Sequence, residues 1–188
     1  MSRRITRESD AGHDAEPTAQ RLHGLAPVVG PATRVLILGS FPSVASLQSQ
    51  QYYAHAQNHF WKILQALWPN DPLPGPDRYA QRCVWAVAHG LGIWDVYASC
   101  ERTGSLDSAI RNAEVNDFAA LKTQCPQLQL IVHNGGESFR HATQVRASLG
   151  VEHFPLVKLP STSPANASWS FERKFEVWRD ALLPAVIV

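Results

Sequence analysis

Short apolar runs alternate along this chain with longer stretches in which apolar residues recur at helical spacing. The clearest run, residues 35–38, is Val-Leu-Ile-Leu, which is typical of a strand buried on both faces of a parallel sheet. Three further short runs are also mainly apolar, with one polar residue in each. The four runs predict strands at residues 35–38, 93–96, 128–132 and 157–159.

Between the predicted strands, the spacing of apolar residues and the positions of Pro and Gly predict helices. Residues 60–67 form one, ended by Pro69, and residues 77–89 form another before Gly90. Three more are expected over 116–125 with Asn116 as the cap, from about residue 136, and after a capping Ser170. This alternation predicts a three-layer α/β/α sandwich around a central, mainly parallel four-stranded sheet.

Length and composition predict one domain. The chain has 188 residues, of which 45% are hydrophobic and 18% charged. Residues 1–24 are polar and lack periodicity, so they are expected to form a flexible tail before a single domain at 25–188. The sequence contains no apolar run of about 20 residues and no secretory signal at its start, so we expect a cytoplasmic protein without membrane attachment.

The ionisable and sulfur-containing residues give little support to several classes of function. Cys83, Cys100 and Cys125 are widely spaced and form no Cys-x-x-Cys pair, so the expectation is buried free thiols and no metal site. The formal net charge is +1, which lacks the strongly basic character of proteins that bind many phosphates. A local basic patch remains compatible with this balance.

Small and polar residues follow each predicted strand. An open parallel sheet binds its ligand outside the carboxyl ends of its strands, so these residues are the candidates for chemistry. They are residues 40–43, 95–97, 134–136 and 161–166.

Four stretches of the chain together resemble the uracil-DNA glycosylase superfamily, and most closely its hypoxanthine-DNA glycosylase branch, also called DNA-deoxyinosine glycosylase. The first is Gly-Ser-Phe-Pro-Ser, and the second contains Asn-His-Phe-Trp; the third joins Gly-Ile-Trp-Asp-Val to Arg-Thr-Gly-Ser-Leu-Asp-Ser, and the fourth is Leu-Pro-Ser-Thr-Ser-Pro-Ala-Asn. They lie at residues 39–43, 52–61, 92–108 and 159–166. The resemblance implies the α/β/α fold of that superfamily and an activity on damaged DNA, single- or double-stranded, by a monomer without a cofactor.

The resemblance also assigns the catalytic residue. Mismatch-specific uracil glycosylases have an Asn two residues after the Gly of the first motif, where this chain has Phe41. In the hypoxanthine branch an Asn before Phe-Trp carries activity, and here it is Asn58. Asn58 is therefore expected to position the attacking water, and the modest basicity of an amide predicts a modest rate.

Base and DNA contacts follow from the same resemblance. Tyr53 is expected to stack on the extruded base, Asn134 to read its lactam edge, and Ser40 and Phe41 to line the base site. The fourth stretch resembles a loop that enters the minor groove, and its expected DNA-contacting residues are Pro160, Ser161, Thr162, Ser163 and Asn166. Asp95 is left outside the catalytic set, since a structural bond to the loop at Arg102 explains it equally well.

These expectations describe a DNA repair glycosylase that flips out a deaminated base and hydrolyses its N-glycosidic bond. Hypoxanthine is the expected base, with uracil and xanthine as alternatives. A mismatch-specific uracil enzyme and a catalytically inactive DNA-binding module of the same fold stay open. A small-molecule hydrolase using Ser40 or Ser43 is disfavoured because the chain lacks a Gly-x-Ser-x-Gly motif.

Overall fold

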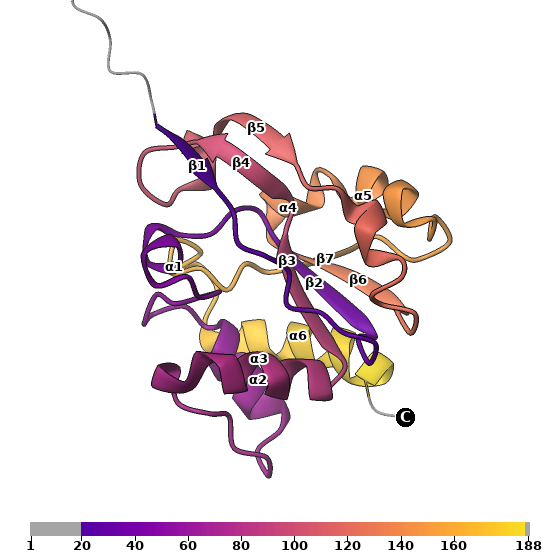
Figure 1. The fold of residues 1–188 in the computed structure, drawn as a ribbon. Coiled ribbons are helices and arrows are strands. Elements are labelled where there is room, and N and C mark those ends of the chain that lie inside the picture. Colours follow the sequence, from indigo (N-terminus) through magenta and orange to yellow (C-terminus); the bar gives the residue numbers. More distant parts are fainter. Residues whose placement is uncertain (1–19, 187–188) are drawn as a thin grey trace, which may run out of the picture.

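A parallel sheet forms the centre of the molecule in the computed structural model, which describes residues 20–186 (Figure 1). Its strands are β2 (Val35–Gly39), β3 (Leu91–Asp95), β6 (Leu130–Asn134) and β7 (Val157–Leu159), in the order β3-β2-β6-β7. All neighbouring pairs are parallel. The four predicted strands are confirmed, with ends that shift by up to two residues. Every residue of β2 is buried, as its unbroken apolar run predicts.

Helices cover one side of this sheet. α2 (Phe60–Leu67), α3 (Tyr79–Ala88) and α6 (Phe171–Val186) lie together below it in Figure 1. In α2, residues at helical spacing turn inward together, and the rings of Phe60 and Trp178 meet edge to face at 6.0 Å. This packing fixes α6 against the start of α2, next to the carboxyl edge of the sheet.

The other side carries shorter helices and a second sheet. α4 (Gly136–Phe139) and α5 (Ala142–Leu149) follow β6, in the place where a helix was predicted. The helix predicted at 116–125 is wrong: only the short 3₁₀ helix η3 (Phe118–Leu121) forms, and Asp117 caps it by accepting from the Ala119 N–H at 3.0 Å. Asn116 instead donates to the Asp95 carbonyl at 2.9 Å.

The second sheet is antiparallel and was not predicted. It contains β1 (Arg21–His23), β4 (Tyr97–Glu101) and β5 (Arg111–Val115), in the order β1-β4-β5. Since β1 pairs with β4, the fold begins before the expected boundary at residue 25. Residues 1–19 of the expected tail lie outside the described residues. Strand β5 is exposed at most of its positions, so it has no apolar run that could have revealed it.

The three remaining elements are short. They are α1 (Val44–Ser49), η1 (Pro76–Arg78) and η2 (Asp107–Ala109). The Ser43 side chain caps α1 by accepting from the Ser46 N–H at 3.2 Å. Within residues 20–186, no helix is long and apolar enough to cross a bilayer.

Candidate active site

A cavity of about 730 Å³ opens at the carboxyl edge of the parallel sheet. Its walls include the loops after β2, β6 and β7, Asp95 at the end of β3, and residues 105–108 after β4. The carboxyl ends of the parallel strands are the expected place for a ligand. All of the site residues expected from the sequence line it: Ser40, Phe41, Tyr53, Asn58, Asn134, Pro160, Ser161, Thr162, Ser163 and Asn166. The structure therefore brings these residues together, while their individual roles remain predictions.

Asn134 ends β6 and joins three parts of the cavity wall. Its Nδ2 donates to Thr162 Oγ1 at 2.9 Å and to the Tyr53 hydroxyl at 3.2 Å, and its Oδ1 accepts from the Thr162 N–H at 2.9 Å. Both amide hydrogens are thus committed in the absence of DNA. If Asn134 reads a base, it must either exchange one of these bonds or use the remaining lone pair of Oδ1.

Tyr53 is held in an uncommon conformation. Its φ is +54°, a left-handed value that bulky residues seldom adopt, and its ring stacks on Phe60 with centroids 3.8 Å apart. Phe60 is fully buried, and Trp61 is buried as well, so both are core aromatics as predicted. Because Phe60 covers one face of the Tyr53 ring, the opposite face is the one that could receive a base.

Asn58 precedes α2, and its side chain is fixed by the start of that helix. Its Oδ1 accepts from the Phe60 N–H at 3.0 Å, and only the oxygen of an amide can accept such a bond. Its Nδ2 makes no hydrogen bond within residues 20–186. The amide therefore offers two free N–H donors and one free lone pair, which is enough to orient a water molecule.

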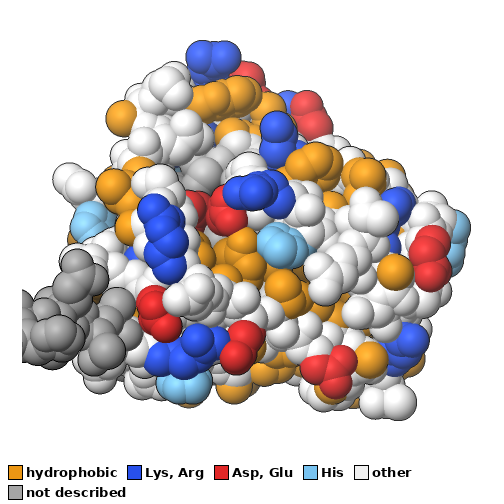
Figure 2. All heavy atoms as spheres, turned by 90° about the horizontal axis from the view of Figure 1, so that it is seen from above, with side chains coloured by type: hydrophobic (Ala, Val, Ile, Leu, Met, Phe, Trp, Pro, Cys, Tyr) orange, Lys and Arg blue, Asp and Glu red, His pale blue; other side chains and the backbone are white. Residues whose placement is uncertain are grey.

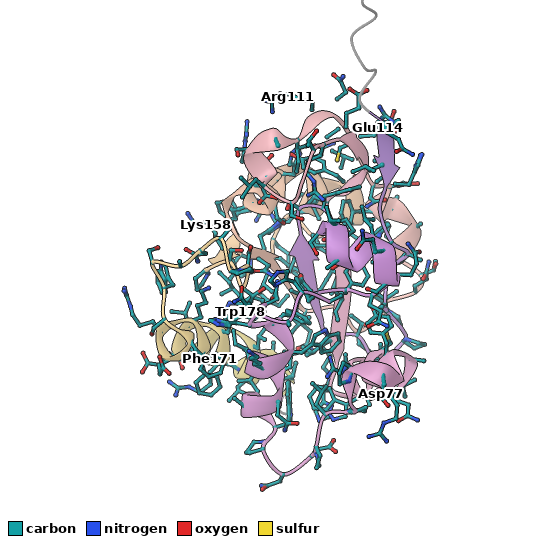
Figure 3. All side chains as sticks on the ribbon, turned by 90° about the vertical axis from the view of Figure 1, so that its left-hand side faces the viewer. Asp77, Arg111, Glu114, Lys158, Phe171 and Trp178 are labelled. Atoms are coloured by element: carbon teal, nitrogen blue, oxygen red, sulfur yellow. The ribbon has the colours of Figure 1, made fainter. Side chains whose placement is uncertain are left out.

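The loop after β7 is anchored to α6 and to the start of α2. Trp178 Nε1 donates to the Pro160 carbonyl at 3.0 Å, Lys174 Nζ lies 3.4 Å from the Ser163 carbonyl, and the His59 N–H donates to the Thr162 carbonyl at 3.0 Å. Figure 3 shows the loop between Lys158 on β7 and Phe171 and Trp178 on α6. Anchoring at three carbonyls makes the loop a fixed projection beside the cavity.

The side chains of Thr162 and Asn166 both bond within the protein. Thr162 is 1% exposed and bonded to Asn134, so its side chain supports the loop rather than facing outward. Asn166 donates to the Ser161 carbonyl at 3.0 Å and does not cap α6, since Ser170 Oγ accepts from the Arg173 N–H at 3.3 Å. Ser161 and Ser163 remain half-buried at the surface of the loop.

Carboxylates contribute to the cavity more than the sequence indicated. Ser40 donates to Asp107 Oδ1 at 2.6 Å, which ties the loop after β2 to η2. Asp107 belongs to the third stretch of the family resemblance, but no role was assigned to it, because its contact joins positions 67 residues apart in the chain. Asp95 also lines the cavity and is 4% exposed.

Arg102 packs against the loop that follows β2. Its guanidinium lies 5.1 Å from the Phe41 ring centroid and donates to the Pro42 carbonyl. It forms no salt bridge or hydrogen bond with Asp95 in the described part of the chain, so the structural bond considered for Asp95 is not found. Phe41 is 6% exposed beneath this guanidinium, which leaves its ring as a cavity wall.

His133 lies apart from the cavity. It is 1% exposed, and its Nδ1 lies 2.8 Å from the Ser138 hydroxyl, which donates to the Leu38 carbonyl at 2.8 Å. The Ser138 oxygen must therefore accept from Nδ1–H. Burial lowers the pKa of His133 to about 4, so the ring is neutral and structural.

The surface of the molecule carries charged residues of both signs. The face seen in Figure 2 shows Lys and Arg interspersed with Asp and Glu, without a continuous basic surface. Lys158 is exposed at the rim of the cavity, where it can meet a phosphate.

Cys100 and Cys125 are buried free thiols, whereas Cys83 is only half-buried. No group of three or more His, Cys, Asp or Glu side chains within residues 20–186 is arranged to hold a metal ion.

Comparison with known proteins agrees with this geometry. Residues 26–182 match the family model of the uracil DNA glycosylase superfamily. The chain is 34% identical over 158 residues to a hypoxanthine DNA glycosylase of Methanosarcina barkeri, covering 84% of this chain and 96% of the relative. It is 36% identical over 155 residues to one of Methanosarcina acetivorans, covering 81% and 93%. A solution NMR structure of a candidate uracil DNA glycosylase from Methanosarcina acetivorans matches with a TM-score of 0.71 and 33% identity, covering 86% and 96%.

Proposed function

Because the chain belongs to the uracil-DNA glycosylase superfamily, we propose that it is a monofunctional DNA glycosylase that excises hypoxanthine from DNA. The observation that carries the proposal is the cavity itself. It brings an amide on Asn134, an aromatic ring on Tyr53 and a second amide on Asn58 to one edge of the sheet. These are the groups needed to read a base edge, to stack on its face and to orient water.

The substrate has to leave the duplex before it can enter this cavity. Extruding a nucleotide costs a few kcal/mol, and the cost is lower for a mispaired base such as hypoxanthine. The anchored loop from Pro160 to Asn166 stands beside the cavity and is suited to fill the space that the base vacates. Lys158 at the rim adds a positive charge for the adjacent phosphate.

The proposed reaction is hydrolysis of the N-glycosidic bond. Cleavage develops positive charge on the sugar and negative charge on the departing base, so donors aimed at the base accelerate it. The backbone N–H groups after β2 can donate to the base from the cavity wall, and Asn134 can do so by exchanging one of its bonds to Thr162 or Tyr53. Asn58 orients the water that attacks the sugar, with its Oδ1 held by the start of α2.

The proposed preference for hypoxanthine over uracil is supported by the first motif and by the relatives. Phe41 occupies the position of the catalytic Asn of mismatch-specific uracil enzymes, and its ring is packed under Arg102. It has no polar atom with which to bind water. The two curated relatives that match over most of the chain are both named hypoxanthine DNA glycosylases.

Cleavage of labelled duplexes tests the proposal. Otherwise identical duplexes carrying one inosine, one uracil, one xanthine or no lesion are incubated with enzyme and then with alkali, which breaks the strand at an abasic site. We expect breaks at inosine, none in undamaged DNA, and a loss of at least about 100-fold in Asn58→Ala. Asn70→Ala is the matched control, because Asn70 is an exposed amide just after α2 and outside the cavity.

Two other results would replace the proposal. Cleavage of the uracil duplex alone would reassign the base. Binding of damaged duplex without cleavage of any substrate, by a protein with a cooperative melting transition, would identify a DNA-binding module that lacks catalysis.

A further inference from the structure

One buried carboxyl group at the site has no role in the mechanism above. Asp95 ends β3, is 4% exposed and lines the cavity. Its Oδ2 is buried without a hydrogen-bond partner, and its side chain accepts no hydrogen bond from any residue between 20 and 186. Buried polar groups are nearly always paired, so a carboxyl group that lines a cavity and has no partner within the protein is a candidate to bond to what the cavity holds.

The contacts of Asp95 place it on the side of the cavity that is expected to hold the base. A Cβ atom placed on Gly39 would lie 2.3 Å from Asp95 Oδ1 and 3.4 Å from the Tyr53 hydroxyl oxygen. The Asp95 carboxyl group and the Tyr53 hydroxyl therefore both lie next to Gly39, at the end of β2. The Tyr53 hydroxyl in turn accepts from Asn134 at 3.2 Å. The carboxyl group thus stands beside the two residues expected to contact the base.

Gly39 makes this position possible. Any side chain there would meet the carboxyl oxygen at a distance that real Cβ atoms do not reach. The strand β2 therefore ends in a residue that leaves room for a carboxyl group from β3. The first motif carries the apolar Phe41 at the position where mismatch-specific uracil glycosylases have an Asn. The ionisable group at this edge of the sheet is Asp95, at the end of the neighbouring strand β3.

We propose that Asp95 is the general acid of the reaction, donating its proton to the hypoxanthine as the purine leaves. The inference rests on the proposed glycosylase function and adds a catalytic residue to it. A purine leaves more readily as a neutral molecule than as an anion, which is why an acid on the base side accelerates the cleavage.

The atoms balance in one hydrolytic cycle. The bond between C1′ of the sugar and N9 of the purine breaks, and its electron pair goes to the purine ring. The Asp95 proton is transferred to a ring nitrogen of the purine, while the oxygen of the water held by Asn58 bonds to C1′. The proton released by that water returns to Asp95, which leaves hypoxanthine, an abasic sugar and the original carboxylic acid.

The surroundings of Asp95 suit an acid that is protonated near neutrality. Burial raises its pKa to about 7, the negative charge of Asp107 raises it as well, and Arg102 lowers it. The other titratable groups that face it are Tyr52, Tyr53 and Tyr79, whose own pKa values burial raises, so these hydroxyls stay neutral. The acid is required protonated, so the rate should fall as pH rises through about 7.

Single-turnover cleavage of the inosine duplex across pH about 5.5 to 8.5 tests this assignment. We expect the wild-type rate to fall with a midpoint near pH 7. Asp95→Asn keeps the shape and can still donate a hydrogen bond, but it cannot transfer a proton. It should be slower by roughly 100-fold at the acidic end, lack the wild-type midpoint, and bind the duplex as wild type does.

Two carboxyl variants serve as comparisons. Asp107→Asn removes the negative neighbour and should move the midpoint to lower pH without removing it, and this result does not depend on the folding of the Asp95 variant. Asp77→Asn changes an exposed carboxyl on η1, away from the cavity, and should match wild type (Figure 3).

The failure of this inference can be told apart from the failure of the proposed function. If wild type cleaves inosine and Asp95→Asn keeps its rate and pH midpoint, Asp95 is not the acid although the enzyme is a glycosylase. A wild-type rate that rises with pH would also overturn the assignment. If wild type cleaves no substrate, the proposed function fails, and the catalytic role of Asp95 falls with it.

Discussion

Asn134 and Thr162 hold each other by two hydrogen bonds, one in each direction. Asn134 Oδ1 accepts from the Thr162 N–H, and Asn134 Nδ2 donates to Thr162 Oγ1, both at 2.9 Å. The pair connects the end of β6 to the loop that follows β7. A residue expected to read the base is thus also the residue that fixes the loop expected to enter DNA.

This double role predicts different results for the two partners. Asn134→Ala leaves the Thr162 N–H unpaired and should cost about 1–3 kcal/mol of stability. It should also reduce inosine excision by at least about 10-fold, since it removes the base-reading amide. Thr162→Val removes only the hydroxyl acceptor and should cost about 1 kcal/mol while retaining most activity. Thermal melting and single-turnover cleavage measure both effects, and equal losses of activity in the two variants would show that Asn134 acts only through the loop.

Lys158 should contribute to DNA binding through a phosphate and not through the base. It is exposed at the cavity rim, where its Nζ lies 5.7 Å from the Phe139 ring centroid. Lys158→Ala should weaken duplex binding at low salt and lower the slope of log K against log salt by about 1. Its cleavage rate at saturating enzyme should stay near wild type.

Fluorescence anisotropy at several salt concentrations measures this slope. Lys62→Ala is the matched control, because Lys62 is exposed on α2 and outside the cavity. An unchanged slope in Lys158→Ala would show that this charge does not meet a phosphate.

The fold could be predicted from the sequence where burial leaves a periodic pattern. β2 is buried on both faces and reads as an unbroken apolar run, and α2 buries residues at helical spacing. β5 has four exposed residues out of five, so its pairing with β4 depends on backbone hydrogen bonds that sequence patterns do not record. β1 was not predicted for a similar reason: it has only three residues and is defined by its pairing with β4.

The candidate site shows the same division. Residues that follow strands or match a family motif could be placed at one edge of the sheet, because the topology of a parallel sheet brings those positions together. The sequence could not predict the hydrogen bonds of Asn134 to Thr162 and of Ser40 to Asp107, because each bond links segments that are far apart in the chain. The sequence also could not predict whether Asp95 pairs with Arg102, because this depends on how the side chains pack.

Asp95 should make the stability of the protein fall as pH rises. Its pKa is about 7 in the folded protein and 3.8 for an ordinary Asp, so between these values the folded state binds more protons than the unfolded state. Stability is then lost at up to about 1.4 kcal/mol per pH unit until the carboxyl ionises. Asp95→Asn should therefore raise the melting temperature more at pH 8 than at pH 4. A gain that is the same at both pH values would show that folding does not raise the pKa of Asp95.

His133 should act in the opposite direction. Its pKa is lowered to about 4 from 6.5, so between these values the unfolded state binds more protons, and stability falls as pH falls. Over the shared range from about pH 4 to 6.5 the two slopes oppose each other, and wild type should show little net change from this pair. His133→Asn retains a donor for Ser138 but does not titrate, so its melting temperature should decrease as pH rises through this range. Asp95→Asn should show an increase over the same range. Thermal melts at half-unit pH steps distinguish the two variants, and parallel curves for wild type and both variants would contradict the proposed protonation states.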